Sequence, residues 1–117
     1  MKTWSQDLKK KNQKLTVVID GGISADDFES YYYSMANDQK LLLKSAINPG
    51  WLTQHVYGKK SVFLDFMNEQ AATIWMHGIN ALFEEVEYDG LWLDMNEATG
   101  FCDGECVNGN VPTPPSA

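Results

Sequence analysis

The sequence predicts an α/β fold in which parallel strands alternate with helices. Two short apolar runs, at residues 15–19 and 91–93, have the length and composition of buried strands. Residues 68–86, which lie between these runs, carry apolar side chains at helical spacing. A strand, a crossover helix and a second strand make a βαβ unit, and such units build parallel sheets.

The composition fits a globular protein with an acidic surface. The chain has 117 residues, of which 44% are hydrophobic, and a net charge of −7 from 16 acids and 9 Lys, without Arg. An acidic chain argues against a nucleic-acid partner, because phosphate binding needs basic surface. No apolar run approaches the roughly 20 residues of a membrane span. The length suits one ordinary domain and falls well short of the about 250 residues of a complete eight-stranded barrel.

The first segment, residues 4–14, is polar and predicts an exposed helix. Ser5 is expected to cap this helix, and Trp4 and Leu8 fall four residues apart on one face. Cations are favoured near a helix C-terminus, where this segment carries Lys9, Lys10, Lys11 and Lys14. Residues 1–15 lack the apolar core of a signal peptide.

Residues 15–19, LTVVI, are rich in β-branched side chains, which favours a buried parallel strand. The run ends at Asp20, which precedes Gly21 and Gly22. Asp20 fits two interpretations, a turn residue that bonds nearby amides and a ligand contact at a strand end. The residues alone leave both interpretations open.

The middle of the chain predicts a short helix and a hairpin arm. Residues 24–27 form a capping pattern that favours a helix within residues 24–38. The tyrosines at 31–33 are expected to pack against the rim of the fold. Residues 40–47 predict a strand or hairpin arm, because the Asn-Pro-Gly sequence at 48–50 is a strong turn signal.

The long helix is expected to begin at Asn68, which suits an N-cap, with Glu69 in its first turn. Its apolar stripe predicts packing against the sheet and consists of Ala72, Trp75, Ile79, Leu82, Phe83 and Val86. His77 falls on the opposite face and is expected in solvent. The helix then leads into the run at 91–93, as a crossover helix should.

The second apolar run follows a turn at Asp89 and Gly90 and stops at Asp94. In barrels of parallel strands, catalytic groups sit at the C-terminal ends of the strands. Asp94 is therefore a candidate catalytic carboxylate, with Asn96 and Glu97 beside it in the chain. The same pattern also fits a buried strand whose end bonds its own backbone.

Residues 92–97, WLDMNE, resemble the nucleophile signature of glycoside hydrolase family 31, the retaining α-glucosidases and their relatives. Residues 14–24, KLTVVIDGGIS, resemble the family's KLVxIVDPxIS segment, and VFLDF at 62–66 resembles its VFPDF. The similarity runs from about Leu8 to Cys106. It implies a partial (β/α)8 TIM barrel, with about two barrel strands, a crossover helix and a loop insertion. Residues 1–106 are then a fragment of the catalytic barrel, and 107–117 a Pro-rich loop or disordered tail.

The resemblance implies a role for each motif residue. Asp94 matches the nucleophile, and Met95 beside it is implied to contact the substrate. Asp20 matches an Asp at the edge of the sugar pocket, and Val18 matches a branched apolar residue that lines it. The family's Pro-Ala after that Asp is replaced by Gly-Gly here, which predicts a more flexible turn. Asn96 and Glu97 are expected to be structural neighbours of the site.

Tyr57 is the expected substitute for a pocket-lining Trp. The family carries a Val-Trp-Pro-Gly element before its VFPDF segment, and residues 55–59, HVYGK, stand at that place. An alternative alignment puts Asn48 at the Trp position, followed by a longer insertion. His55 is expected in a surface loop, and without a second His or Cys nearby it predicts no metal site. Neither a metal nor an organic cofactor is expected.

The two cysteines, Cys102 and Cys106, fit either a small disulfide loop or a pair of free thiols. The resemblance favours a disulfide, because fungal relatives carry a similar FCxGxC sequence after the nucleophile motif. A disulfide implies an oxidising compartment, which suggests a secretory or lysosome-like location for a full-length parent.

The resemblance also shows what the chain lacks. Retaining hydrolysis needs a second carboxyl group. In the family this acid/base is an Asp on a later strand. The Arg and His of the family's sugar pocket also come from later in the barrel. Glu97 lies only three residues past Asp94, too near to straddle one sugar. The chain is therefore expected to act on α-linked oligosaccharides only with the remainder of the barrel and to be inactive alone. The alternatives are a non-catalytic carbohydrate-binding or split-barrel interaction module, and an unrelated small α/β domain.

Overall fold

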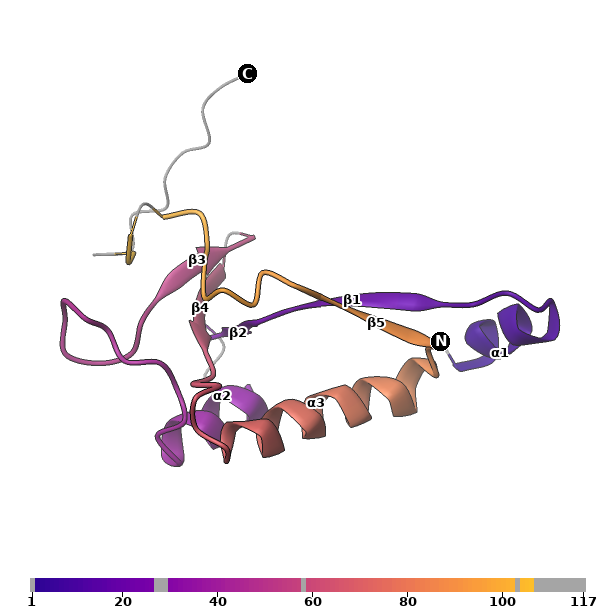
Figure 1. Ribbon diagram of the computed structural model, residues 1–117, viewed down its shortest axis with the longest axis horizontal. Helices are drawn as coiled ribbons and strands as arrows, with labels where there is room; N and C mark the ends of the chain where they lie inside the picture. Colours follow the sequence, from indigo (N-terminus) through magenta and orange to yellow (C-terminus); the bar gives the residue numbers. More distant parts are fainter. Residues whose placement is uncertain (1, 27–29, 58, 103, 107–117) are drawn as a thin grey trace, which may run out of the picture.

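The computed structural model describes residues 2–26, 30–57, 59–102 and 104–106. Its elements in chain order are α1 (Lys2–Lys10), β1 (Thr16–Asp20), β2 (Gly22–Ser24), α2 (Tyr31–Asp38), β3 (Gln54–Val56), β4 (Lys59–Phe63), α3 (Ala71–Val86) and β5 (Gly90–Asp94). In Figure 1, α3 lies along the β1–β5 pair, with α1 at one end and the β3–β4 sheet at the other. The expected tail at 107–117 lies outside the described residues.

The predicted βαβ unit is confirmed. Strands β1 and β5 pair in parallel, and their register sets Val18 against Trp92 and Asp20 against Asp94. Side chains alternate between the two faces of a strand, so these four residues share one face. The neighbouring Ile19 lies on the other face and lines a cavity together with residues of α3. The unit thus has one face against its crossover helix and one face away from it.

The predicted burial of these strands is wrong. Val18 is 54% exposed, Trp92 60% and Leu93 52%. A strand of a parallel sheet is buried when helices or other strands cover both of its faces. Here α3 runs along one face of a two-stranded pair, and nothing within the described residues covers the face that carries Val18 and Trp92. Leu93 lies on the face of Ile19, towards α3, and is exposed where it lines an open cavity at the end of β5.

A second sheet, antiparallel with the order β2–β4–β3, was not expected from the sequence. Strand β4 contains the start of the VFLDF segment and pairs with β2 through Ile23 and Val62. Strand β3 contains His55, which is half-buried, so its expected place in a surface loop is wrong. The backbone of Gln54–Val56 pairs with Ser61–Lys59, and this ladder holds His55 in a strand.

The core lies between α2, α3 and the strand β4. Leu41 and Leu64 are 1% exposed and Leu42 is 2% exposed, and Ala36 and Ile74 pack into the same cluster. Residues 40–47 form the expected hairpin arm, through bridges that join Leu42 to Leu64 and Lys44 to Trp51. Tyr32 and Tyr33 pack against this core as predicted for the tyrosine cluster, whereas Tyr31 is 55% exposed and the prediction is wrong for it.

The helix starts differ from the predicted ones. Helix α1 begins at Lys2, so Ser5 lies inside it, buried, and does not cap it. Ser24 ends strand β2, where its pairing with Ser61 replaces the expected helix start. Helix α2 is capped instead by Ser30, whose Oγ accepts a hydrogen bond from the Tyr33 amide at 3.4 Å. Asp27, part of the predicted capping pattern, lies outside the described residues.

Helix α3 begins three residues after the predicted N-cap. Asn68 uses its Oδ1 to accept the amide of Gln70 at 3.0 Å, which closes a turn before the helix. The predicted apolar stripe is partly wrong, since Phe83 is 42% exposed and Ala72 is exposed, while Ala71 is fully buried. Ala71 and Ile74 belong to the core cluster with Leu64. In the first turns of α3 the buried positions are therefore one residue earlier than the predicted Ala72 and Trp75. His77 is exposed, as predicted.

Asp89 ties the amino ends of β1 and β5 together. Its Oδ2 accepts the Leu15 amide at 3.0 Å, and its Oδ1 lies 3.3 Å from Lys14 Nζ. Nearby, Lys9 Nζ of α1 lies 3.8 Å from a carboxylate oxygen of Glu87. None of the helices that the structure describes combines the length and apolar character of a membrane span.

Replacing Asp89 by asparagine is expected to lower the stability of the chain near neutral pH but to have little effect in acid. The hydrogen bond from the Leu15 amide, assisted by Lys14, holds the pKa of Asp89 below its usual value. Such a carboxyl stabilises the fold above its unfolded pKa of about 3.9, and this contribution is lost as pH falls through the folded pKa. Urea unfolding of both proteins at a series of pH values measures the difference, with Glu85→Gln as an exposed control. A difference that stays constant as pH falls would contradict this assignment.

Candidate active site

The carboxyl ends of β1 and β5 bring two carboxylates together. Asp20 and Asp94 are partners in the parallel register and share one face. Adjacent strands lie about 4.8 Å apart, so the two side chains start as close neighbours. The Met95 amide donates a hydrogen bond to Asp94 Oδ1 at 3.0 Å, which orients the carboxylate at the strand end. Asp94 is half-buried, as the first polar residue after the apolar part of β5.

The backbone after Asp94 turns sharply. Met95 has φ 52° and Ala98 has φ 57°, a left-handed conformation that costs a non-glycine residue free energy and is concentrated at functional sites. Gly21 is buried against this turn, and a Cβ atom there would lie 3.1 Å from Asn96 Cα and 3.2 Å from Met95 O. The Gly-Gly sequence predicted as a flexible turn therefore serves a close approach of two backbones at Gly21.

Tyr57 lies at the same end of the structure as Met95. Its Oη is 4.0 Å from Met95 Sδ, and its ring meets the ring of Phe101 edge to face, with centroids 5.7 Å apart. The two aromatic side chains are 70% and 51% exposed. Tyr57 also has a left-handed φ of 49°. Sequence reasoning missed Phe101; the signal was an aromatic residue directly before the first cysteine.

A cavity of about 390 Å³ opens at the end of β5. Asp94, Met95, Asn96 and Glu97 line it in one run, and the remaining lining residues are Leu93, Phe66 and Trp75. The Phe66 and Trp75 rings meet edge to face with centroids 5.4 Å apart. The cavity thus combines a carboxylate, an amide and an aromatic wall. Such groups can form hydrogen bonds with the hydroxyl groups of a sugar and stack against its ring.

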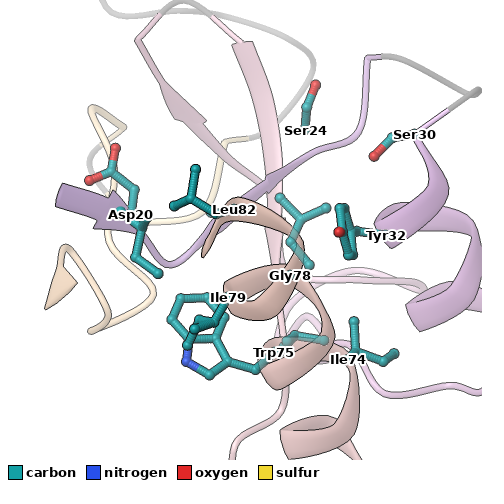
Figure 2. Close-up of a pocket in the computed structure, with 13 residues that line it drawn as sticks. Asp20, Ser24, Ser30, Tyr32, Ile74, Trp75, Gly78, Ile79 and Leu82 are labelled. Atoms are coloured by element: carbon teal, nitrogen blue, oxygen red, sulfur yellow. The ribbon is translucent and has the colours of Figure 1, made fainter. Parts of the chain in front are cut away.

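A second cavity, of about 330 Å³, lies between β1, β2 and α3. Figure 2 shows its apolar wall of Trp75, Ile79 and Leu82, with Asp20 at one side. Asp94 does not line it. Of the predicted site residues, Asp94, Met95, Asn96 and Glu97 thus line one cavity, and Tyr57 contacts Met95. Asp20 and Val18 do not line that cavity. They are related to Asp94 only by their positions in the paired strands β1 and β5.

Two polar atoms near the site are buried without a hydrogen-bond partner among the described residues, Asn96 Oδ1 and His55 Nδ1. Glu97 is exposed. The structural roles predicted for Asn96 and Glu97 stay predictions. In the described part of the chain, no three His, Cys, Asp or Glu side chains gather in a way that would hold a metal ion.

Cys102 and Cys106 form a disulfide, with Cα atoms 5.4 Å apart. The loop that it closes follows Phe101 directly and lies beside strand β3. The Phe101 amide donates to His55 O at 3.0 Å, and the Cys106 amide donates to Thr53 O at 3.0 Å. The chain after residues 92–97 is therefore attached to the strand that precedes Tyr57.

Comparisons with known proteins agree on one family. The model of the glycosyl hydrolases family 31 TIM-barrel domain matches residues 1–116. Intestinal sucrase-isomaltase of Suncus murinus is 30% identical over 117 residues, covering 94% of this chain and 6% of that protein. An alpha-glucosidase of Hordeum vulgare is 31% identical over 103 residues, covering 86% of this chain and 12% of that protein. Glucoamylase 1 of Candida albicans is 27% identical over 109 residues, covering 88% of this chain and 11% of that protein. The chain thus spans about an eighth or less of the length of these relatives.

Proposed function

Since this chain belongs to the TIM-barrel domain family of the family 31 glycosyl hydrolases, we propose that it is the barrel segment that supplies the catalytic nucleophile, Asp94. The proposed reaction is retaining hydrolysis of α-glucosidic bonds in α-linked oligosaccharides. The observation that carries the proposal is the position of Asp94, at the carboxyl end of a parallel strand and in the wall of a cavity of about 390 Å³. This is the end of a barrel strand at which catalytic groups act.

In the proposed mechanism a carboxylate oxygen of Asp94 attacks the anomeric carbon of the bound sugar. A covalent glycosyl ester forms as the bond to the leaving oxygen breaks, and a carboxylic acid from elsewhere in the barrel protonates that oxygen. That group, now a carboxylate, removes a proton from water, whose oxygen attacks the anomeric carbon as the bond to Asp94 breaks. This releases the sugar and regenerates the Asp94 carboxylate. The hydrogen bond from the Met95 amide orients the Asp94 carboxylate for its attack in the first step.

The other predicted site residues have positions that suit substrate binding in this scheme. Asp20 lies beside Asp94 across the register and accepts hydrogen bonds from sugar hydroxyls. Val18 is exposed on the same face and supplies an apolar surface. Tyr57 and Met95, which touch, border the sugar from the loop side. Aromatic faces stack on sugar rings, so the exposed ring of Tyr57 suits this role.

The acid/base is proposed to come from outside residues 1–117. A retaining enzyme holds its two carboxyl groups about 5–5.5 Å apart on opposite sides of the scissile bond. Glu97 lies on the same turn as Asp94 and lines the same cavity, so the two carboxylates approach a sugar from one side. The exposed face of Val18 and Trp92 is proposed to be covered by further barrel strands.

The chain alone is expected to hydrolyse no α-glucoside, because it supplies one of the two carboxyl groups that the reaction needs. The measurement is release of a chromogenic leaving group from an aryl α-glucoside by the purified chain. The matched control is the chain with Asp94→Asn, which sets the background. If the chain hydrolyses the substrate and the Asp94→Asn chain does not, the proposal that the acid/base lies outside residues 1–117 is wrong.

The mass of the species that contains this segment in its source tests the wider proposal. Immunoblotting and intact-mass measurement should detect the segment in a species far larger than 13.2 kDa, which hydrolyses α-glucosides. A stable species at 13.2 kDa without such activity would instead favour the second candidate, a carbohydrate-binding or split-barrel module. The exposed aromatic residues Tyr57, Phe101 and Trp92 favour that second candidate, and calorimetric binding of maltose by the chain would support it.

A further inference from the structure

The pairing of Tyr57 with Phe101 requires an explanation, because neither ring belongs to the core. Both are exposed, and they come from segments far apart in the sequence. An aromatic pair on the surface makes few contacts that would fix it. Its geometry must therefore be set by the backbone that carries each ring. For Phe101 that backbone is the start of the disulfide loop, whose amide binds His55 O at 3.0 Å.

Gln54 lies at the centre of the contact between this loop and β3. It is 6% exposed, and its Nε2 donates a hydrogen bond to Gly104 O inside the loop. Its Oε1 accepts the Cys102 amide at 3.4 Å and lies 3.5 Å from Cys106 Sγ. A disulfide sulfur has no proton to donate, so the last approach is a contact and not a hydrogen bond. One buried amide group thus touches both cysteines and the glycine between them.

The fit between Gln54 and the loop is close. A Cβ atom on Gly100 would lie 2.8 Å from both Gln54 Cβ and Gln54 Oε1, and 2.9 Å from His55 O. The absence of a side chain at Gly100 lets the backbone before Phe101 pass over Gln54. The loop is also attached at its far side, where Glu105 Oε1 accepts the Ala46 amide at 2.9 Å. The backbone on either side of Phe101 is therefore held against Gln54.

The chemistry of the contact selects an amide side chain. Gly104 O needs a donor and the Cys102 amide needs an acceptor, at neighbouring points in a buried place. A glutamine amide offers both, whereas a carboxylate only accepts, and a methionine sulfur cannot donate and accepts only weakly. A buried polar group that loses its hydrogen-bond partner costs free energy, and this cost favours conformations in which water reaches the group. Loss of the amide would thus loosen the loop on β3 and leave it held only at its two ends, by the backbone hydrogen bonds of Phe101 and Cys106 and by Glu105.

We propose that Gln54 is a positioning residue, whose amide fixes the disulfide loop so that Phe101 meets Tyr57 beside Met95. The role of this aromatic pair in binding the sugar next to Asp94 rests on the proposed function; the positioning itself does not. The aromatic pair then presents one preset surface to a sugar, which avoids the cost of ordering two exposed side chains on binding. Gln54 acts on the site through the loop and touches no substrate.

The test compares Gln54→Met with Gln54→Glu in the full chain by NMR. In the wild type, contacts between the Tyr57 and Phe101 rings should give nuclear Overhauser effects. In Q54M these effects should vanish, and hydrogen exchange of the Phe101 and Cys102 amides should accelerate about tenfold or more. Exchange of the β1 and β5 amides should stay unchanged, as it should throughout in the exposed control Gln70→Met.

Q54E supplies a signature that a general loss of packing would not produce. At neutral pH its carboxylate accepts from Cys102 but repels Gly104 O, so the ring contacts should be weakened. In acid the protonated carboxyl can donate to Gly104 O and accept from Cys102 at once, so the contacts should return. The wild type over the same pH range is the control. Ring contacts that persist in Q54M, or that never return in Q54E, would overturn the proposal, and Q54E decides alone if Q54M fails to fold.

A maltose titration of the complete hydrolase that is proposed to contain this segment, with and without Gln54→Met, separates this inference from the proposed function. Weaker maltose binding by the Q54M hydrolase, together with the lost ring contacts in the Q54M chain, would support both. If the ring contacts depend on Gln54 while Q54M leaves maltose binding by the hydrolase unchanged, the positioning by Gln54 is supported and the sugar-binding role of the aromatic pair is contradicted.

Discussion

In the complete hydrolase that is proposed to contain this segment, Asp94→Asn should lower kcat for an α-glucoside by about 10³-fold or more. An asparagine amide has nearly the size of the carboxylate and can still accept the Met95 amide through its oxygen. It is a much poorer nucleophile, so the glycosyl ester does not form. KM should change far less than kcat, because the substitution removes an interaction made in the transition state.

Glu97→Gln is the matched control for this prediction. It also converts a carboxylate into an amide, in the same turn and in the wall of the same cavity. Its expected effect on kcat is within about tenfold, since Glu97 is not proposed to react. A fluorinated α-glucosyl fluoride that traps the glycosyl ester provides a direct assay, in which digestion and mass spectrometry should find the sugar on the peptide with Asp94. A label on another carboxylate, or equal losses in both variants, would contradict the assignment.

The parts of the fold that were predictable are those in which short-range pattern determines the structure. The β-branched run before Asp20, the helical spacing of residues 68–86 and the apolar run before Asp94 each specify their element locally. Their order implies a parallel pair by the geometry of crossover connections. The alignment of Asp20 with Asp94 follows from these elements, because both carboxylates end a strand of the same sheet.

The parts that were not predictable depend on contacts between distant segments. Strand β3 has three residues, one of them His55, and becomes a strand through its pairing with Lys59–Ser61. Trp92 is exposed because no other segment of the described residues covers its face of the strand. The sequence of residues 91–93 does not indicate whether such a segment is present. Phe101 is at the site because Gln54 and the disulfide bring its loop to β3, and residue spacing carries no trace of that contact.

Leu64→Ala should destabilise the chain by about 2–5 kcal/mol, the cost of removing a buried leucine and leaving a cavity. Leu64 is 1% exposed, forms a bridge to Leu42 and belongs to the cluster that joins α2, α3 and β4. A domain of this size has about 5–15 kcal/mol of stability in total, so the loss is a large share of it. Urea unfolding followed by circular dichroism measures the difference between the two proteins.

Leu93→Ala makes the same chemical change at a side chain that is 52% exposed, and it should cost less than about 1 kcal/mol. The contrast between the two leucines decides whether this segment has a core of its own. A large loss at Leu64 with a small loss at Leu93 means that the cluster around Leu64 is packed without help from further barrel strands. Equal and small losses would mean that the cluster is not packed in the isolated chain. The cavity that holds Asp94 would then also need the rest of the proposed barrel, because its wall residue Trp75 packs against that cluster.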